Sequence, residues 1–218
     1  MSLAKLRQGS ISGFGLLPPR AIRSFAEALP HGLLAKSSVA ALTFAAVTAS
    51  LSAAPGVGGF FGAVLALLMI AIAAIDARAF IIPNPLTLLA FLLGLASCAS
   101  GADGAWQEVA FAALRGGLLA FGFFALREGY YRLRGRHGLG LGDVKLAAVG
   151  GVWLSWPMIL AAIEIAAAAA LFSVGFSYLV RRCPFDATTK LPFGLYFAPA
   201  IWLCWLIGEL LPAGLGTF

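Results

Sequence analysis

Charged residues are scarce in this sequence. Only 11% of the 218 residues are Asp, Glu, Lys or Arg, whereas 61% are hydrophobic, and the mean hydropathy is +0.95. A soluble domain usually carries about a quarter charged residues. The composition therefore excludes an ordinary soluble domain and indicates an integral membrane protein.

Cysteine and histidine are scarce as well. The three cysteines, Cys98, Cys183 and Cys204, are far apart in the sequence, and the two histidines are His31 and His137. Without a C-x-x-C pair or a histidine cluster, neither a structural zinc site nor a disulfide framework has support. We expect no metal and no cofactor.

Strict alternation of apolar and polar residues is also missing, so a transmembrane β-barrel is not expected. Long apolar runs recur instead, and in lipid such runs must be helical because their backbone groups have to be hydrogen-bonded internally. The sequence predicts an all-α, polytopic membrane protein, a bundle of about six to seven transmembrane helices. We expect residues 1–37 to be a basic tail and residues 38–218 to form one membrane domain. The seven candidate spans are 38–54, 57–75, 85–100, 107–126, 143–156, 157–180 and 193–211.

Positive charge is almost absent from one set of connecting segments. If the N-terminus is cytoplasmic, 13 of the 15 Lys and Arg residues fall in the tail and in segments 76–84, 127–142 and 181–192, all on the cytoplasmic side. This is the positive-inside pattern of membrane proteins. It explains the net charge of +6 by topology, so nucleic acid is not expected as a partner.

Only nine residues are acidic, and most of them fall in segments that water can reach. Inside a span, an ionisable side chain is costly and marks a functional or structural site. Glu164 and Arg115 are expected at similar depths in the sixth and fourth spans. We expect them to form a structural ion pair, with a role in transport as the alternative.

Two acids, Asp76 and Asp143, remain at the predicted cytoplasmic ends of spans. Two carboxylates within a few ångströms of each other cannot both ionise, so one can activate water while the other donates a proton to a carbonyl oxygen. This is the apparatus of aspartyl hydrolysis of a peptide bond. Asp143 begins a helix, whose positive end favours the ionised form, whereas Asp76 ends one. We therefore expect Asp143 to act as the base and Asp76 to hold the proton.

Glycines and prolines flank both aspartates. Gly140 and Gly142 leave the backbone before Asp143 uncovered, so an extended peptide can approach the carboxylate. Pro83 and Pro85 prevent the chain after Asp76 from continuing as a helix and favour extended geometry at Asn84. The combination is more specific than a glycine-rich turn alone.

Three segments resemble the motifs of the type IV prepilin peptidases, the bacterial members of the GxGD class of intramembrane aspartyl proteases. The first is Asp76 followed by Ile82-Pro83-Asn84, similar to the family's first aspartate and its Ile-Pro-Asn signature. The second is GLGDVKLAAVGG at 140–151, which matches the glycine-aspartate-lysine motif at Gly140, Gly142, Asp143 and Lys145. The third is the late segment LPFG, formed by Leu191, Pro192, Phe193 and Gly194. The three occur in the expected order within residues 57–211.

The resemblance implies an aspartic endopeptidase with Asp76 and Asp143 as its catalytic residues. Its substrates would be type IV prepilin-like proteins, whose short leader is removed at the cytoplasmic face of the bacterial inner membrane. Residues 191–194 are candidates for substrate contact. The chain resembles a short form of the family without the cysteine-paired methyltransferase region, so methyltransferase activity is not expected. The expected partners are the substrate and the lipid bilayer, and the oligomeric state is not predicted.

Several alternatives stay open at this point. Lys145 either extends to the membrane surface as a positive-inside residue or contacts the aspartates, and Asn84 bonds either the loop backbone or the substrate. Small residues such as Gly116 and Gly151 serve either to admit a substrate helix or to pack the protein's own helices. For the whole chain, a proton-coupled transporter and a non-catalytic component of a pilus or secretion assembly are the rival functions.

Overall fold

The computed structural model describes residues 36–101, 105–135, 138–181 and 192–211. Within these ranges all regular secondary structure is α-helical, which confirms the all-α, polytopic class. The helices are α2 (Lys36–Ala53), α3 (Val57–Ala79), α4 (Asn84–Ala99), α5 (Ala105–Arg134), α6 (Leu141–Trp153), α7 (Trp156–Arg181) and α8 (Phe193–Leu210).

Each predicted span corresponds to one helix, but the lengths differ from the expectation in two places. Helix α5 continues to Arg134, well past the predicted end at residue 126. Helix α6 has only 13 residues, or about 20 Å at 1.5 Å per residue, so it cannot cross a hydrocarbon layer of about 30 Å. The prediction of a membrane span at 143–156 is therefore wrong. Leu154 is extended, and Pro157 lies in the first turn of the next helix, where proline is tolerated.

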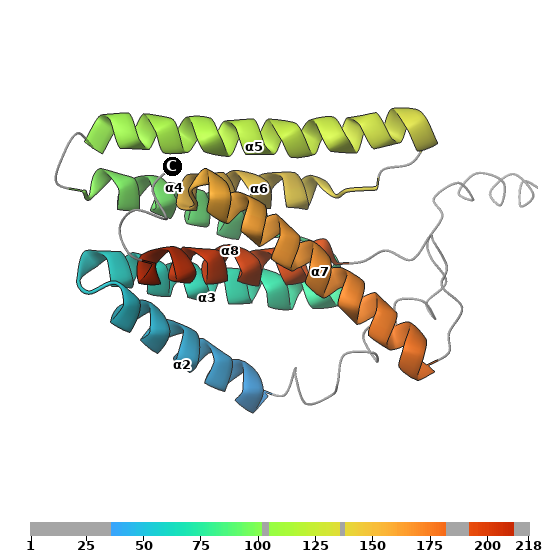
Figure 1. Cartoon of the computed structure of the whole chain (residues 1–218), viewed down its shortest axis with the longest axis horizontal. Coiled ribbons are helices and arrows are strands. Elements are labelled where there is room, and N and C mark those ends of the chain that lie inside the picture. The colour runs from blue at the N-terminus through green and yellow to red at the C-terminus, as the bar shows by residue number, and fades with distance from the viewer. Residues whose placement is uncertain (1–35, 102–104, 136–137, 182–191, 212–218) are drawn as a thin grey trace, which may run out of the picture.

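Among the described residues, four segments are long and apolar enough to cross a membrane: Val57–Ala79, Trp106–Arg134, Trp156–Ser177 and Phe193–Leu210. Helices α2 and α4 are apolar but shorter. Figure 1 shows α3 and α8 side by side through the middle of the bundle, with α5 along one edge, α2 at the other and α7 crossing obliquely. Helix α8 packs against α3 and α7, and α5 packs chiefly against α6.

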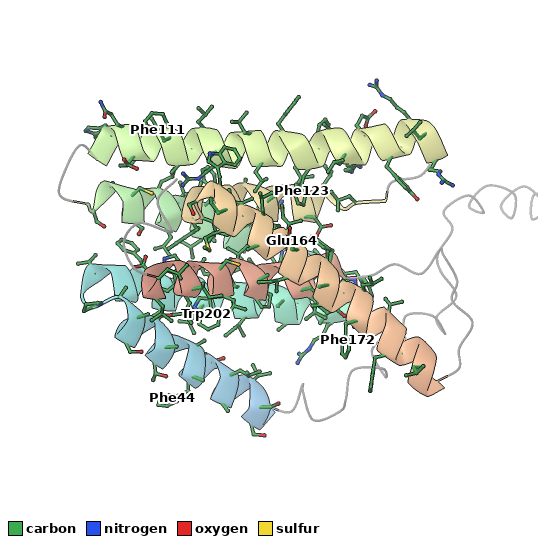
Figure 2. All side chains as sticks on the ribbon, in the orientation of Figure 1. Phe44, Phe111, Phe123, Glu164, Phe172 and Trp202 are labelled. Carbon is green, nitrogen blue, oxygen red and sulfur yellow. The ribbon has the colours of Figure 1, made fainter. Side chains whose placement is uncertain are left out.

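The core lies where α3, α6 and α8 meet. Its fully buried side chains include Leu65, Met69, Ile72, Leu146, Val149, Phe197 and Ile201. Phe123 points from α5 toward this core, as Figure 2 shows, and its ring stacks on Phe197 with centroids 5.7 Å apart. Phe44 and Phe172 are about three-quarters exposed and point away from the bundle (Figure 2). Apolar side chains in that position face lipid in a protein that spans a membrane.

Glycines let two pairs of helices approach closely. A Cβ atom on Gly62 of α3 would overlap the ring of Trp205 on α8, so the indole occupies the space above that glycine. A Cβ atom on Gly151 of α6 would lie 2.6 Å from the Cα of Gly116 on α5. Gly116 and Gly151 therefore pack the protein's own helices, which is how small residues commonly act in membrane bundles. Gly117 has open space around its Cα.

The chain alternates direction, so the end of α3 and the beginnings of α4, α6 and α8 lie at the same end of the bundle, on the right in Figure 1. Both aspartates and the segments flanking them come from these helix ends.

Candidate active site

Asp76 lies in the last turn of α3, and its side chain is buried. Its Oδ2 accepts a hydrogen bond of 2.9 Å from the backbone N–H of Leu195, the third residue of α8. N–H groups in the first turn of a helix lack regular intrahelical partners, and this one otherwise has only the Pro192 carbonyl, at 3.2 Å. Asp76 thus caps the N-terminus of a helix 119 residues further along the chain.

Asp143 is the third residue of α6, and its side chain is also buried. Its Oδ2 accepts a hydrogen bond of 3.1 Å from the backbone N–H of Gly140. Gly140 has φ of −75°, a value that any residue adopts, so the glycine is not needed for its conformation. A Cβ atom there would lie 3.1 Å from Asp143 Oδ2, so the absence of a side chain keeps the carboxylate uncovered.

Ile82 connects the two aspartate motifs. Its buried side chain comes from the segment between α3 and α4. A Cβ atom on Gly142 would lie 2.8 Å from Ile82 Cβ, and one on Gly194 would lie 2.7 Å from Ile82 Cδ1 and 2.9 Å from Asp76 Oδ2. Ile82 therefore packs against Gly142, the residue before Asp143, and against Gly194, which lies next to Asp76. The contacts of Ile82 thus bring the segment that begins α6 and the segment that begins α8 against the same side chain.

The two carboxylates lie at the helix ends predicted from the sequence, and Asp76 has one further helix contact. Asp143 lies at the N-terminus of α6, as predicted. Asp76 ends α3, but it also sits at the N-terminus of α8 through its bond to Leu195. Asp76 therefore lies at the negative end of one helix dipole and the positive end of another, whereas Asp143 lies only at a positive end, and the assignment of Asp143 as the base stays a prediction.

Lys145 and Asn84 contact each other. Lys145 Nζ donates a hydrogen bond of 2.6 Å to Asn84 Oδ1, which joins the first turns of α6 and α4. The side chain of Lys145 is exposed. The bond was not foreseen from the sequence, because the two residues are 61 positions apart and each had a local explanation. It holds the segment that carries Pro83 beside the helix that carries Asp143.

The late LPFG segment lies at the start of α8. Leu191 falls outside the described residues, Pro192 is the residue before the helix, and Phe193 and Gly194 are its first two residues. The ring of Phe193 lies 5.3 Å from that of Phe197, centroid to centroid. Gly194 is buried against Asp76 and Ile82. The segment thus joins the same site, while contact between these residues and a substrate stays a prediction.

The predicted ion pair between Arg115 and Glu164 is wrong. Arg115 Nε donates a hydrogen bond of 2.7 Å to the carbonyl of Gly151, and its Nη2 donates one of 3.4 Å to the carbonyl of Val152. Glu164 lies on α7 (Figure 2) with an exposed side chain. Two residues predicted at a similar depth in two spans still need to face each other to form an ion pair. The guanidinium of Arg115 instead faces the end of α6, where carbonyls lack helical partners.

The described part of the chain contains no cluster of three or more His, Cys, Asp or Glu side chains that could hold a metal ion. Cys98 and Cys204, the two cysteines that fall in the described ranges, are both free thiols. The groups that the structure gathers at the site include the two carboxylates and the backbone N–H groups that bind them.

Comparison with known proteins gives consistent matches. A model of the Type IV leader peptidase family matches residues 63–175, just over half of the chain. The chain is 28% identical over 163 residues to a prepilin leader peptidase/N-methyltransferase of Aeromonas hydrophila, covering 75% of this chain and 54% of that protein. It is 31% identical over 151 residues to the one from Xanthomonas campestris, covering 69% and 51%.

A shorter relative matches as well. Leader peptidase HopD of Escherichia coli is 37% identical over 89 residues, 40% of this chain and 57% of that protein. The chain spans about half the length of the curated relatives it matches. No solved structure gives a significant match.

Proposed function

The chain belongs to the type IV leader peptidase family, and on this premise we propose that it is an aspartic endopeptidase. Its substrates are type IV prepilin-like proteins, from which it removes the short leader at the cytoplasmic face of the bacterial inner membrane. The observation that supports the proposal is that Ile82 contacts both Gly142, the residue before Asp143, and Gly194, which lies against Asp76.

The two carboxylates share one proton, because like charges at close range cannot both be ionised at little cost. The ionised carboxylate removes a proton from water, and the resulting hydroxide forms a bond to the scissile carbonyl carbon. The protonated carboxylate donates its proton to the carbonyl oxygen. The C–N bond then breaks as the first carboxylate returns its proton to the leaving amine. At the same time the second carboxylate takes back a proton from one hydroxyl of the tetrahedral intermediate, which becomes the carboxylic acid product, so the pair again holds one proton. The sharing of one proton is a property of the pair, so the roles are not assigned to individual residues.

Local backbone geometry supports access of an extended peptide. Pro83, in extended conformation with ψ of 128°, precedes α4, and Ile81 exposes 62% of its surface beside it. Gly140 on the other side presents backbone without a side chain. The first turns of α4, α6 and α8 face this end of the bundle (Figure 1), and the positive ends of these helix dipoles favour negative charge developing on a carbonyl oxygen.

The test is leader cleavage in a strain that co-expresses a prepilin with the enzyme. Asp76→Asn and Asp143→Asn keep the size of each side chain but remove the carboxylate, so each variant is expected to leave the prepilin uncut. Glu128→Gln is the matched control, because Glu128 lies at the same end of the bundle and, among the described residues, its ion pair is with the exposed Arg132. Cleavage by both aspartate variants, at wild-type levels of membrane protein, would refute the proposal.

A further inference from the structure

Helix α6 has 13 residues, whereas α3 has 23 and is long enough to cross a membrane. Along the helix axis, Asp143 lies about 15 Å from Trp153 at the end of α6, whereas Asp76 lies about 29 Å from Val57 at the far end of α3. Figure 1 shows the two helices running along the same direction from the same end of the bundle. The last turn of α6 therefore stops roughly 14 Å short of the far end of α3, at a depth where lipid supplies no hydrogen bonds.

The last carbonyl groups of a helix have no partner within that helix. At the end of α6, the Gly150 carbonyl accepts the N–H of Leu154 at 3.0 Å. The next two carbonyls, those of Gly151 and Val152, accept hydrogen bonds from the guanidinium of Arg115 at 2.7 and 3.4 Å. A cation at a helix C-terminus also matches the negative end of the dipole. Arg115 is the C-terminal cap of α6, supplied by α5.

The approach of α5 to α6 is built for this contact. Gly116, the next residue after Arg115, lies against Gly151 so closely that a Cβ atom on Gly116 would be 2.8 Å from the Ala148 carbonyl. This backbone contact brings the half-buried guanidinium alongside the last turn of α6. Trp153 ties the same end to α4, since its Nε1 donates to the Ala90 carbonyl at 2.9 Å.

We infer that Arg115 is a positioning residue that fixes the axial position of α6 and thereby of Asp143. The bond between Gly140 and Asp143 lies within the segment that begins α6, so it does not fix the helix relative to its neighbours. At the site end, α6 is held by an exposed lysine bond and by the Ile82 contact. A slide of one residue, about 1.5 Å, would break both bonds of Arg115 and move Asp143 away from Asp76.

The test uses Arg115→Met, which keeps an apolar chain but removes every donor, and Arg115→Lys, which keeps the charge but removes the planar fork. Arg132→Met is the matched control, because Arg132 is an exposed residue of the same helix that pairs only with Glu128. We measure backbone amide hydrogen exchange by mass spectrometry with the protein in nanodiscs. The exchange rate over residues 146–154 is expected to rise in both Arg115 variants, and more in Arg115→Met than in Arg115→Lys. Arg132→Met is expected to exchange there as the wild type does.

The second readout is leader cleavage per folded molecule, and this part rests on the proposed function. Because a 1 Å misplacement of a reacting group costs about 10²-fold in rate, Arg115→Met is expected to lower kcat by about 10- to 100-fold. KM is expected to stay unchanged, because Gly151 lies about 12 Å along the helix from Asp143. Arg115→Lys is expected to recover part of kcat, which a general loss of folded protein would not produce.

Unchanged exchange in α6 in both variants would overturn the inference, and so would an unchanged kcat in a variant whose exchange has risen. If Arg115→Met does not accumulate in the membrane, Arg115→Lys decides by the same two criteria. If the wild type cuts no prepilin, the proposed function fails, and amide exchange alone decides whether Arg115 holds the end of α6.

Discussion

Gly194 offers the sharpest test of the site geometry, because a single methyl group added there meets both Asp76 and Ile82. In Gly194→Ala the new Cβ would lie 2.7 Å from Ile82 Cδ1 and 2.9 Å from Asp76 Oδ2. Ordinary carbon–carbon contacts begin near 3.5 Å, and carbon–oxygen contacts near 3.3 Å. The methyl group therefore has to push the carboxylate by about 0.4 Å or the isoleucine methyl by about 0.8 Å.

Neither neighbour can move without consequence. Asp76 Oδ2 is held by the Leu195 N–H at 2.9 Å, a bond that weakens as the carboxylate is displaced. Ile82 is buried and also rests on Gly142, so its displacement moves the first turn of α6. If the logarithm of the rate scales with misplacement at about 10²-fold per ångström, shifts of 0.4 to 0.8 Å lower kcat by roughly 6- to 40-fold.

Stability is expected to change much less than activity. Overpacking a buried position costs about 1–3 kcal/mol, and replacing Gly by Ala in a helix recovers up to about 1 kcal/mol. Gly208→Ala is the matched control, since Gly208 lies on the same helix and a Cβ atom there meets nothing within 4 Å. Leader cleavage under single-turnover conditions, with thermal unfolding measured by tryptophan fluorescence, separates the two effects. Wild-type cleavage by folded Gly194→Ala, or an equal loss in Gly208→Ala, would refute the reasoning.

The remaining predictions concern other parts of the site. Ile82→Ala removes the side chain that contacts both Gly142 and Gly194 and leaves a cavity there. We expect it to lower the free energy of unfolding by about 2–5 kcal/mol and to lower kcat as well; an unchanged melting temperature would contradict this. Lys145→Met breaks the bond to Asn84 and is expected to reduce cleavage by several-fold, about the effect of one exposed hydrogen bond of roughly 1 kcal/mol; Lys145→Arg, which keeps a donor, should recover part of it. The cleavage rate is expected to fall at both low and high pH, because the two carboxylates work only while they share one proton. A rate that keeps rising toward low pH or toward high pH would argue against a shared proton. Arg132→Cys in a chain without its native cysteines is expected to react with an impermeant maleimide from the cytoplasmic side only, and labelling from the other side would reverse the proposed orientation.

Hydropathy and motif spacing were enough to predict most of the helices and the end of the bundle at which both aspartates lie. They failed at α6, because Leu154 and Trp156 extend the apolar run although the backbone is extended at Leu154. A hydropathy average does not register a turn made of apolar residues. The short helix became apparent only from its backbone geometry.

Contacts across the bundle were the other part that the sequence did not supply. Arg115 was given the wrong partner, because the direction in which a side chain leaves its helix depends on how that helix packs. The bond from Leu195 to Asp76 joins residues 119 positions apart, and no local pattern at either residue indicates it. Ile82 was recognised within a motif, but its contact with two glycines required the fold.

The donor that caps Asp76 belongs to the last helix of the bundle. During synthesis both aspartates leave the ribosome before Leu195 does, so a chain that has inserted only through α7 already contains the carboxylates. In that intermediate Asp76 has no Leu195 N–H to hold it, and Ile82 has no Gly194 on which to rest. The order of translation thus delays assembly of the carboxylate pair until α8 is in place.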